Sequence, residues 1–289
     1  MDINKFRVPE GETLNLADHS TDFTGDYTVK DDAVKDLKSN IKRLKDLQNV
    51  LYADDKYALL IIFQAMDAAG KDGAIKHVMS GVNPQGTQVF SFKNPSSEEL
   101  DHGYLWRCMK ATPERGRIGI FNRSYYEDVL VVRVHPQILQ TSQLPADIIN
   151  DSNIWEERFE QIRSFEKYLT ENGIEVLKFY LNVSKEEQKS RFLARIDTPE
   201  KNWKFSTADM KERSFWDDYQ NAYKEAIQAT STKKAPWYIL PADNKWFTRL
   251  AVSEVIAQKL ESLDLKYPQV SEEHINRLQE AKKILENGG

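Results

Sequence analysis

The segment Ala58–Gly73 limits what this chain can fold into more than any other stretch of the sequence. It reads ALLIIFQAMDAAGKDG, in which an apolar run typical of a buried strand leads into a turn of small residues containing Gly70 and Lys71. A helical pattern begins after the turn. Strand, glycine–lysine turn and helix in this order are the layout of a phosphate-binding loop. Ala65 replaces the first glycine of the usual G-x-x-x-x-G-K-[ST] pattern, and Asp72 replaces its final Ser or Thr.

The turn has the features that bind phosphate oxygens. Backbone N–H groups over residues 68–71 and the N-terminal end of the following helix would converge on an anion. Gly70 permits a close approach of the backbone, and Lys71 supplies a positive charge. The alternative is a simple strand–helix turn whose lysine is solvated. We expect phosphate contacts from the whole turn, which comprises Ala68, Ala69, Gly70, Lys71, Asp72 and Gly73.

Two acids in this turn need separate explanations. Asp72 suits the first turn of a helix, where the helix dipole favours a negative charge. Asp67 lies inside the loop, and its carboxylate would repel bound phosphates unless a metal ion or a proton intervened. Mg²⁺ is usually bound through one or two carboxylates together with substrate oxygens. Asp67 is therefore the first predicted metal ligand.

A second group of polar residues follows another apolar strand pattern, which ends at Phe121. The strand delivers Asn122 and Arg123, and Glu127 comes a few residues later. The Arg123 guanidinium can bind two phosphate oxygens at once, and Glu127 is placed to complete a metal site or to position an acceptor phosphate. The alternative is an edge turn in which Arg123 and Glu127 pair only with each other.

Strand patterns alternate with helical patterns along the chain. We predict strands at residues 57–63, 87–92, 117–121, 175–183 and 237–240, and helices at 31–51, 72–81, 96–110, 154–172, 185–196 and 207–229. This alternation predicts an α/β protein, a three-layer α/β/α sandwich with a parallel sheet. Ligands bind at the carboxyl ends of the strands in such sheets, so both polar groups would lie on one edge.

The chain shows no repeat or linker, which favours a single domain over residues 1–289. We divide it into an N-terminal arm and helix (1–56), a core (57–260) and a charged helical tail (261–289). The helix predicted at 31–51 carries an apolar stripe. That stripe serves either the core or a partner chain.

The overall charge and the single cysteine exclude several classes of protein. A formal net charge of -5 over 289 residues argues against a general nucleic-acid binder. Basic residues nevertheless gather within 107–123 and 191–213, either as solvated helix faces or as a channel for a polyanion. Cys108 has no second cysteine to pair with, and no apolar run reaches membrane-spanning length. We therefore expect a cytoplasmic protein with neither a nucleic-acid nor a membrane partner.

Three ordered motifs give the chain a close resemblance to the polyphosphate kinase 2 family. They lie at residues 65–73, at 121–136 and at 191–206. The resemblance implies a thymidylate kinase-like P-loop fold with a helical lid over about 191–213. It also implies dependence on Mg²⁺, with Mn²⁺ as an alternative, and reversible phosphoryl transfer between inorganic polyphosphate and nucleotides. The sequence Asn122-Arg-Ser resembles the class III branch, which converts AMP to ADP and ADP to ATP; guanine nucleotides and a homo-oligomer, dimer or tetramer, are further expectations.

The same resemblance assigns roles by position. The predicted catalytic residues are Asp67, Lys71, Asn122, Arg123, Glu127 and Arg191. The acids Asp67 and Glu127 would hold the metal ion, and the cations would hold the transferring phosphates. Arg133 and Lys204 complete the predicted phosphate contacts. In the lid, Trp203 or Phe205 would either face a nucleobase or act as a packing anchor.

Two other functions stay open. An ATP-dependent nucleoside or nucleotide kinase of the same fold should carry Ser or Thr after Lys71, where this chain has Asp72. A protein that only binds polyphosphate would need no acids beside its anion. The presence of Asp67 and Glu127 therefore favours an enzyme.

Overall fold

The computed structural model of the chain describes residues 1–287, apart from the side chain of Lys204. Its centre is one sheet of five parallel strands in the order β2-β3-β1-β4-β5. The strands are β1 (Ala58–Gln64), β2 (Thr87–Ser91), β3 (Ile118–Asn122), β4 (Ile174–Asn182) and β5 (Trp237–Pro241). Every residue of β1 is buried, as its unbroken apolar run requires. The predicted strands are confirmed to within one residue at each end.

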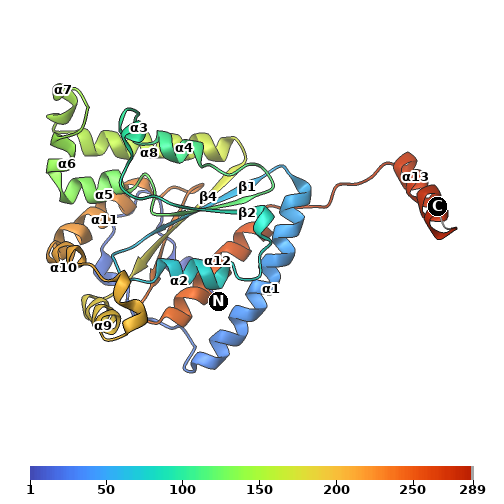
Figure 1. Cartoon of the computed structure of the whole chain (residues 1–289), viewed down its shortest axis with the longest axis horizontal. Helices are drawn as coiled ribbons and strands as arrows, with labels where there is room; N and C mark the ends of the chain where they lie inside the picture. Colours follow the sequence, from blue (N-terminus) through green and yellow to red (C-terminus); the bar gives the residue numbers. More distant parts are fainter. Residues whose placement is uncertain (288–289) are drawn as a thin grey trace.

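Helices cover both faces of the sheet. On one face, α5 (Glu127–Val134), α8 (Ile154–Glu171) and α11 (Trp216–Thr230) pack against one another, and α8 contacts β4. On the other face, α12 (Lys245–Glu261) contacts β5, α2 (Lys71–Val78) and α1 (Lys30–Asp54) (Figure 1). The predicted three-layer α/β/α sandwich is confirmed.

The apolar stripe of α1 serves the core. Leu44 and Leu51 join the main hydrophobic core, while Ala33 and Leu37 pack against Leu250 of α12. Helices α1 and α12 lie side by side (Figure 1). Of the two roles that the sequence left open for this stripe, packing within the chain is the one observed.

Several helical segments differ from their predictions. The helix predicted at 96–110 is two short helices, α3 (Ser97–Leu100) and α4 (Trp106–Lys110), separated by a turn at Gly103. The helix predicted at 207–229 is interrupted at Phe215, which ends α10 (Thr207–Ser214) and precedes α11. Helix α12 was not predicted, because buried residues lie on most sides of it and leave no single apolar stripe.

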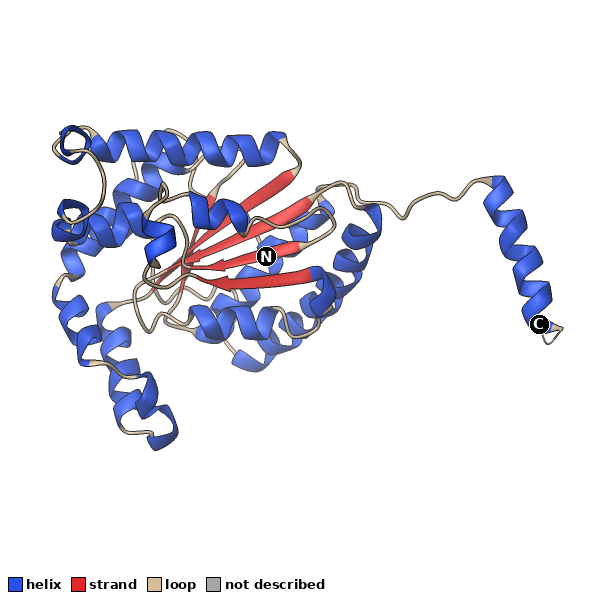
Figure 2. Cartoon of the chain, turned by 45° about the horizontal axis from the view of Figure 1, so that its top comes forward, coloured by secondary structure: helices blue, strands red, loops and turns tan. Residues whose placement is uncertain are grey.

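The remaining helices connect the layers or extend from them. They are α6 (Pro136–Gln140), α7 (Ala146–Ile149), α9 (Lys185–Ile196) and α13 (Glu272–Glu286), with short 3₁₀ helices at Ile3–Phe6, Leu16–Asp18, Pro84–Gly86 and Pro199–Lys204. The predicted lid segment consists of α9, the 3₁₀ helix that begins at Pro199, and α10. It extends from the carboxyl ends of the strands (Figure 2).

Helix α13 lies well away from the rest of the chain (Figures 1 and 2). An irregular segment connects it to α12, and Leu278 and Leu285 on α13 are 52% and 79% exposed. The predicted tail helix is therefore confirmed, with its apolar face uncovered. Over residues 1–287, no helix has the length and apolar character that crossing a membrane requires.

Candidate active site

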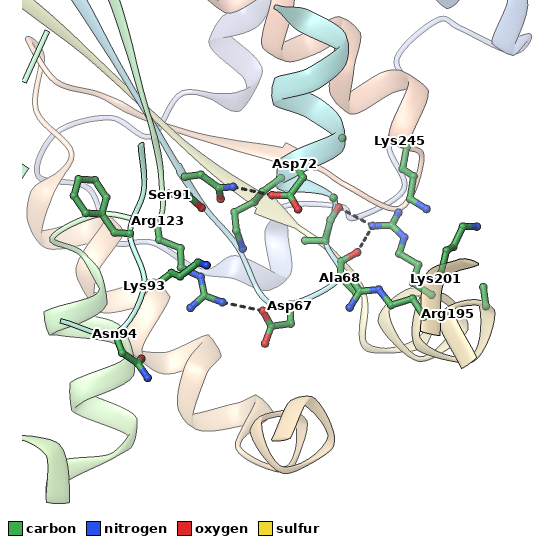
Figure 3. Close-up of a pocket in the computed structure, with 18 residues that line it drawn as sticks. Asp67, Ala68, Asp72, Ser91, Lys93, Asn94, Arg123, Arg195, Lys201 and Lys245 are labelled. Carbon is green, nitrogen blue, oxygen red and sulfur yellow. Dashed lines mark hydrogen bonds and ion pairs between the residues drawn. The ribbon is translucent and has the colours of Figure 1, made fainter. Parts of the chain in front are cut away.

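The two polar groups predicted from the sequence meet at the carboxyl edge of the sheet. Strands β1 and β3 are parallel neighbours, and Phe63 pairs with Asn122 in their register. The loop after β1 and the turn after β3 therefore lie side by side. Together with the lid they surround a cavity of about 800 Å³ (Figure 3). Its wall includes every residue of the loop from Asp67 to Gly73.

The loop has an unusual backbone path. Ala68 has a φ of 62° and Gly70 a φ of 110°, both in the left-handed region, where a residue with a Cβ atom is disfavoured. Lys71 opens α2, so the positive end of the helix dipole faces the cavity. The Lys71 Nζ donates a hydrogen bond of 2.8 Å to the Ala65 carbonyl. Burial lowers the pKa of Lys71, and the Asp67 carboxylate opposes that shift.

Arg123 lies between two carboxylates. Its Nη2 is 3.4 Å from Asp67 Oδ1, and its Nη1 is 3.8 Å from Glu127 Oε2. The residue has a φ of 66°, and its backbone N–H donates to the Phe63 carbonyl. Burial alone would lower the pKa of Arg123, but Glu127 and Asp67 together raise it. The pairing with Glu127 that the sequence offered as an alternative is present, and Asp67 completes a group of three charges.

Glu127 and Asp72 are the other two acids of the site. Glu127 opens α5, and burial raises its pKa, although Arg123 and Lys71 oppose the shift. Asp72 lies in the first turn of α2, and its Oδ1 accepts a hydrogen bond of 2.7 Å from Asn122 Nδ2. The two acids therefore differ in their partners, since Glu127 contacts a cation and Asp72 a neutral amide.

The acids fit a magnesium ion that is bound together with substrate. Within residues 1–287, no three His, Cys, Asp or Glu side chains gather as ligands for a metal. Asp67 and Glu127 do flank the same guanidinium, and the Asp67 side chain is 34% exposed on the cavity wall. Mg²⁺ needs only one or two carboxylates when phosphate oxygens supply other ligands. Asp67, on the cavity wall, and Glu127, which is not among the lining residues, are therefore the side chains that would hold such an ion.

The sequence model described as Polyphosphate kinase 2 (PPK2) matches residues 27–268. This chain belongs to the polyphosphate kinase 2 family. The ADP-polyphosphate phosphotransferase of Rhodopseudomonas palustris is 53% identical to it over 267 residues, which cover 92% of each chain. The AMP/ADP-polyphosphate phosphotransferase of Meiothermus ruber is 42% identical over 92% of this chain and 96% of that protein.

Among solved structures, the polyphosphate kinase 2 of Arthrobacter aurescens TC1 superposes with a TM-score of 0.87. Its sequence is 40% identical, and the match covers 96% of this chain and 95% of that one. The P-loop kinase fold implied by the resemblance is therefore confirmed for this member of the polyphosphate kinase 2 family.

One predicted phosphate contact is not brought to the cavity. Arg133 pairs with Glu225 of α11 and lies over the Trp155 ring, 5.4 Å from its centroid, outside the cavity wall. The structure thus corrects its assignment to the phosphate site. Lys204 falls on the one side chain between residues 1 and 287 that is not described.

Arg191 lines the cavity, but its N–H groups are already engaged. Its Nη1 donates to the Ala68 and Ala69 carbonyls at 3.0 and 2.6 Å. Its Nη2 donates to the Ala242 and Asp243 carbonyls at 2.6 and 3.0 Å. Direct binding of a phosphate by Arg191 would require one of these bonds to break.

Several cavity residues were not predicted as site residues. They are Ser91 at the end of β2, Phe92, Lys93 and Asn94 after it, Ala194, Arg195 and Lys201 in the lid, and Lys245 at the start of α12. The sequence held one weak signal for Lys93 and Lys245, namely that each lies a few residues after a strand of the parallel sheet. Arg195 also pairs with Asp209 of α10 at 3.6 Å, which connects the two helices of the lid.

The two lid aromatics differ in their surroundings. The Phe205 ring packs edge-on against the buried Phe192 ring, with centroids 6.2 Å apart. Trp203 is 78% exposed, and its Nε1 donates to the Glu200 carbonyl at 3.0 Å. Phe205 is therefore a packing anchor of the lid.

Proposed function

We propose that this chain transfers phosphoryl groups between inorganic polyphosphate and nucleotides. The observation that carries the proposal is the position of Arg123 between Asp67 and Glu127, beside Lys71 of the phosphate-binding loop. A site that only holds an anion gains nothing from acids at this place. Transfer between two phosphate groups uses cations that stabilise the transferring group and acids that hold a metal ion beside it. The names of the relatives from Rhodopseudomonas palustris and Meiothermus ruber support the same reaction.

The residues act by positioning and by electrostatics. Lys71 and Arg123 offset the repulsion between two phosphate groups and stabilise the charge on the transferring one. Lys93, Lys201 and Lys245 line the same cavity beyond the loop, so its positive charge extends past a single phosphate (Figure 3). This extension suits a long polyanionic donor better than a single phosphate. No protein nucleophile is required, because the acceptor phosphate attacks directly.

Mg²⁺ is the proposed cofactor, with Mn²⁺ as an alternative. Asp67 and Glu127 are the residues that would hold it. When bound, the ion supplies positive charge to the phosphate oxygens and orients them. Arg123 contacts both acids, so it is placed to keep them together before the ion and the substrates bind.

AMP and ADP are the proposed acceptors, and guanine nucleotides are further candidates. The class III resemblance of Asn122 and Arg123 supports this choice, as does the Meiothermus ruber relative, whose name includes both AMP and ADP. Transfer to AMP gives ADP, and a second transfer gives ATP, each shortening the polyphosphate by one unit. The reverse transfer lengthens it.

A defined reaction mixture tests this function. Purified chain, AMP, Mg²⁺ and polyphosphate without ATP should yield ADP, measured by anion-exchange chromatography. Lys71→Ala should lower kcat/KM by about 10²–10³, as the loss of one transition-state cation typically does. Activity only with ATP as donor would favour the nucleotide kinase. Polyphosphate binding without turnover, weakened by Lys71→Ala, would favour the simple binder.

We also propose that the chain forms a homo-oligomer, either a dimer or a tetramer. The exposed apolar face of α13 supports this, because an isolated helix of this length is marginal in water and gains stability by packing. Light scattering on the full chain should show more than one copy. Leu278→Glu should reduce the mass if α13 takes part, whereas Gln279→Glu on the same helix should leave it unchanged.

A further inference from the structure

Three successive carbonyl groups of the phosphate-binding loop are held by α9. The Gln188 Nε2 donates to the Asp67 carbonyl at 3.0 Å. The Arg191 Nη1 donates to the next two carbonyls, those of Ala68 and Ala69. Both side chains are almost fully buried, with 1% and 6% of their surface exposed. Helix α9 thus contacts the loop on the carbonyl side of its peptides.

The hydrogen-bonding capacity of Arg191 is filled by the protein itself. Besides the two loop carbonyls, its Nη2 donates to the carbonyls of Ala242 and Asp243, and its Nε donates to Glu187 Oε1 at 2.7 Å. A guanidinium has five N–H groups, and these bonds use all five. Binding a phosphate would leave a buried carbonyl without a donor, which is unfavourable.

Holding the carbonyls also orients the N–H groups. In a trans peptide the N–H points opposite to the carbonyl, and the chain has no cis peptide bond among the described residues. The N–H groups of Ala68 and Gly70 therefore point away from α9. Ala68 keeps this path although its φ of 62° is disfavoured for a residue with a Cβ atom. Without the bonds from α9, we expect the loop to relax.

We propose that Arg191 and Gln188 are positioning residues, which hold the phosphate-binding loop in its anion-accepting form before any phosphate arrives. Gln188 also connects the loop to α10, the last helix of the lid segment, because its Oε1 accepts a hydrogen bond of 2.6 Å from Arg213. Movement of α10 is thereby coupled to the Asp67 peptide through one buried amide. The expected loss of activity rests on the proposed function, whereas the expected change in amide exchange does not.

Amide hydrogen exchange of the free protein tests the positioning role without any substrate. Arg191→Lys keeps the charge but cannot reproduce five bonds in a planar fork, and Gln188→Met removes the amide at similar size. Arg195→Lys is the matched control, since Arg195 is one turn further along α9, lines the cavity and pairs with Asp209. Exchange is followed in peptides covering residues 65–74, where the Ala69 and Ala74 N–H groups are hydrogen-bonded.

We expect both test variants to exchange these amides at least about tenfold faster than the wild type, the change that loss of one buried hydrogen bond produces. Their kcat/KM should fall by a similar factor, while circular dichroism shows an intact fold. Arg195→Lys should raise the KM for polyphosphate and leave exchange unchanged.

Two outcomes would overturn the proposal. One is a Gln188→Met protein whose loop amides, without substrate, exchange at the same rate as in the wild type. This result decides the question even if Arg191→Lys fails to fold. The other is an Arg191→Lys protein with wild-type exchange and a raised KM for polyphosphate, since that would make Arg191 a direct phosphate ligand. A wild-type chain without phosphotransferase activity would count against the proposed function alone, because the exchange result does not depend on it.

Discussion

Asn122 and Asp72 join the end of β3 to the first turn of α2 through a hydrogen bond of 2.7 Å between Asn122 Nδ2 and Asp72 Oδ1. An amide nitrogen only donates, so Asp72 accepts through this oxygen. Asp72 lies in the first turn of α2, as predicted, and the bond gives it a second role that the sequence did not indicate, that of fixing the loop to the end of β3.

Asn122→Asp should disrupt this connection. Two carboxylates would then face each other at hydrogen-bonding distance, and we expect kcat/KM to fall about tenfold or more, the equivalent of losing a hydrogen bond to a charged group. Steady-state kinetics with AMP and polyphosphate measures the effect. In the double variant Asn122→Asp, Asp72→Asn the donor and acceptor are exchanged, so most of the activity should return. A double variant no better than Asp72→Asn alone would show that Asp72 acts on substrate or metal directly.

The loop and the turn after β3 were predictable because their chemistry is local. Strand patterns placed Lys71 and Arg123 just after two buried strands, and the rule for parallel sheets brought those ends to one edge. Lys93 and Lys245 also follow strands, yet nothing in their local sequence distinguishes them from surface lysines. Their place in the site depends on the strand order β2-β3-β1-β4-β5, which the sequence pattern does not specify.

The environment of Arg191 could not be predicted from its neighbours in the sequence. A basic helix face near a phosphate loop suggests an anion ligand. Whether the N–H groups of Arg191 are free depends on carbonyls supplied by Ala242 and Asp243, which are distant in the sequence. Helix α5 was missed for another reason, since its run Val129-Leu-Val-Val-Arg-Val134 favours a strand by residue preference alone.

Lys178 and Glu166 form an ion pair inside the core, and breaking it should be costly. Their Nζ–Oε2 distance is 2.5 Å, and the side chains are 0% and 1% exposed. Lys178→Met leaves the Glu166 carboxylate buried without its cation, so we expect a loss of about 3–5 kcal/mol of unfolding free energy. Urea denaturation followed by circular dichroism measures this loss.

The control for this pair is Lys259→Met, since Lys259 and Glu175 are also 2.5 Å apart but are 23% and 17% exposed. Water can solvate the remaining carboxylate there, and the expected loss is at most about 1 kcal/mol. Equal losses in the two variants would contradict the idea that burial determines the cost of breaking the pair.

Glu212 of α10 should make the stability of the protein depend on pH. It accepts hydrogen bonds from Tyr219 Oη at 2.6 Å and from the His135 ring at 2.8 Å. Although burial alone would raise the pKa of Glu212, these two partners lower it below the ordinary value of 4.5. A lowered pKa means that the folded state favours the carboxylate, so its contribution to stability is complete above about pH 4.5 and is lost below it.

Thermal unfolding at pH 7 and at pH 3.5 tests this dependence. Glu212→Gln should destabilise the protein at pH 7 by about 1 kcal/mol, a value reduced for partial exposure, and by less at pH 3.5. Glu114→Gln is the control, because Glu114 is 69% exposed in its pair with Arg117. A Glu212→Gln effect that is equal at both pH values would show that the carboxylate charge contributes nothing.

Cys108 should be inert while the protein is folded. Its side chain is fully buried, and burial raises the pKa of the thiol from 9.0 to about 12. Since only the thiolate reacts, alkylation at pH 8 should be about 10³-fold slower in the folded protein than in the unfolded chain. Mass spectrometry after iodoacetamide treatment, with and without 8 M urea, measures the ratio; the urea sample is the positive control, because Cys108 is the single cysteine of the sequence. Rapid labelling without urea, at unchanged circular dichroism, would mean that α4 opens readily and that Cys108 is not a stable part of the core.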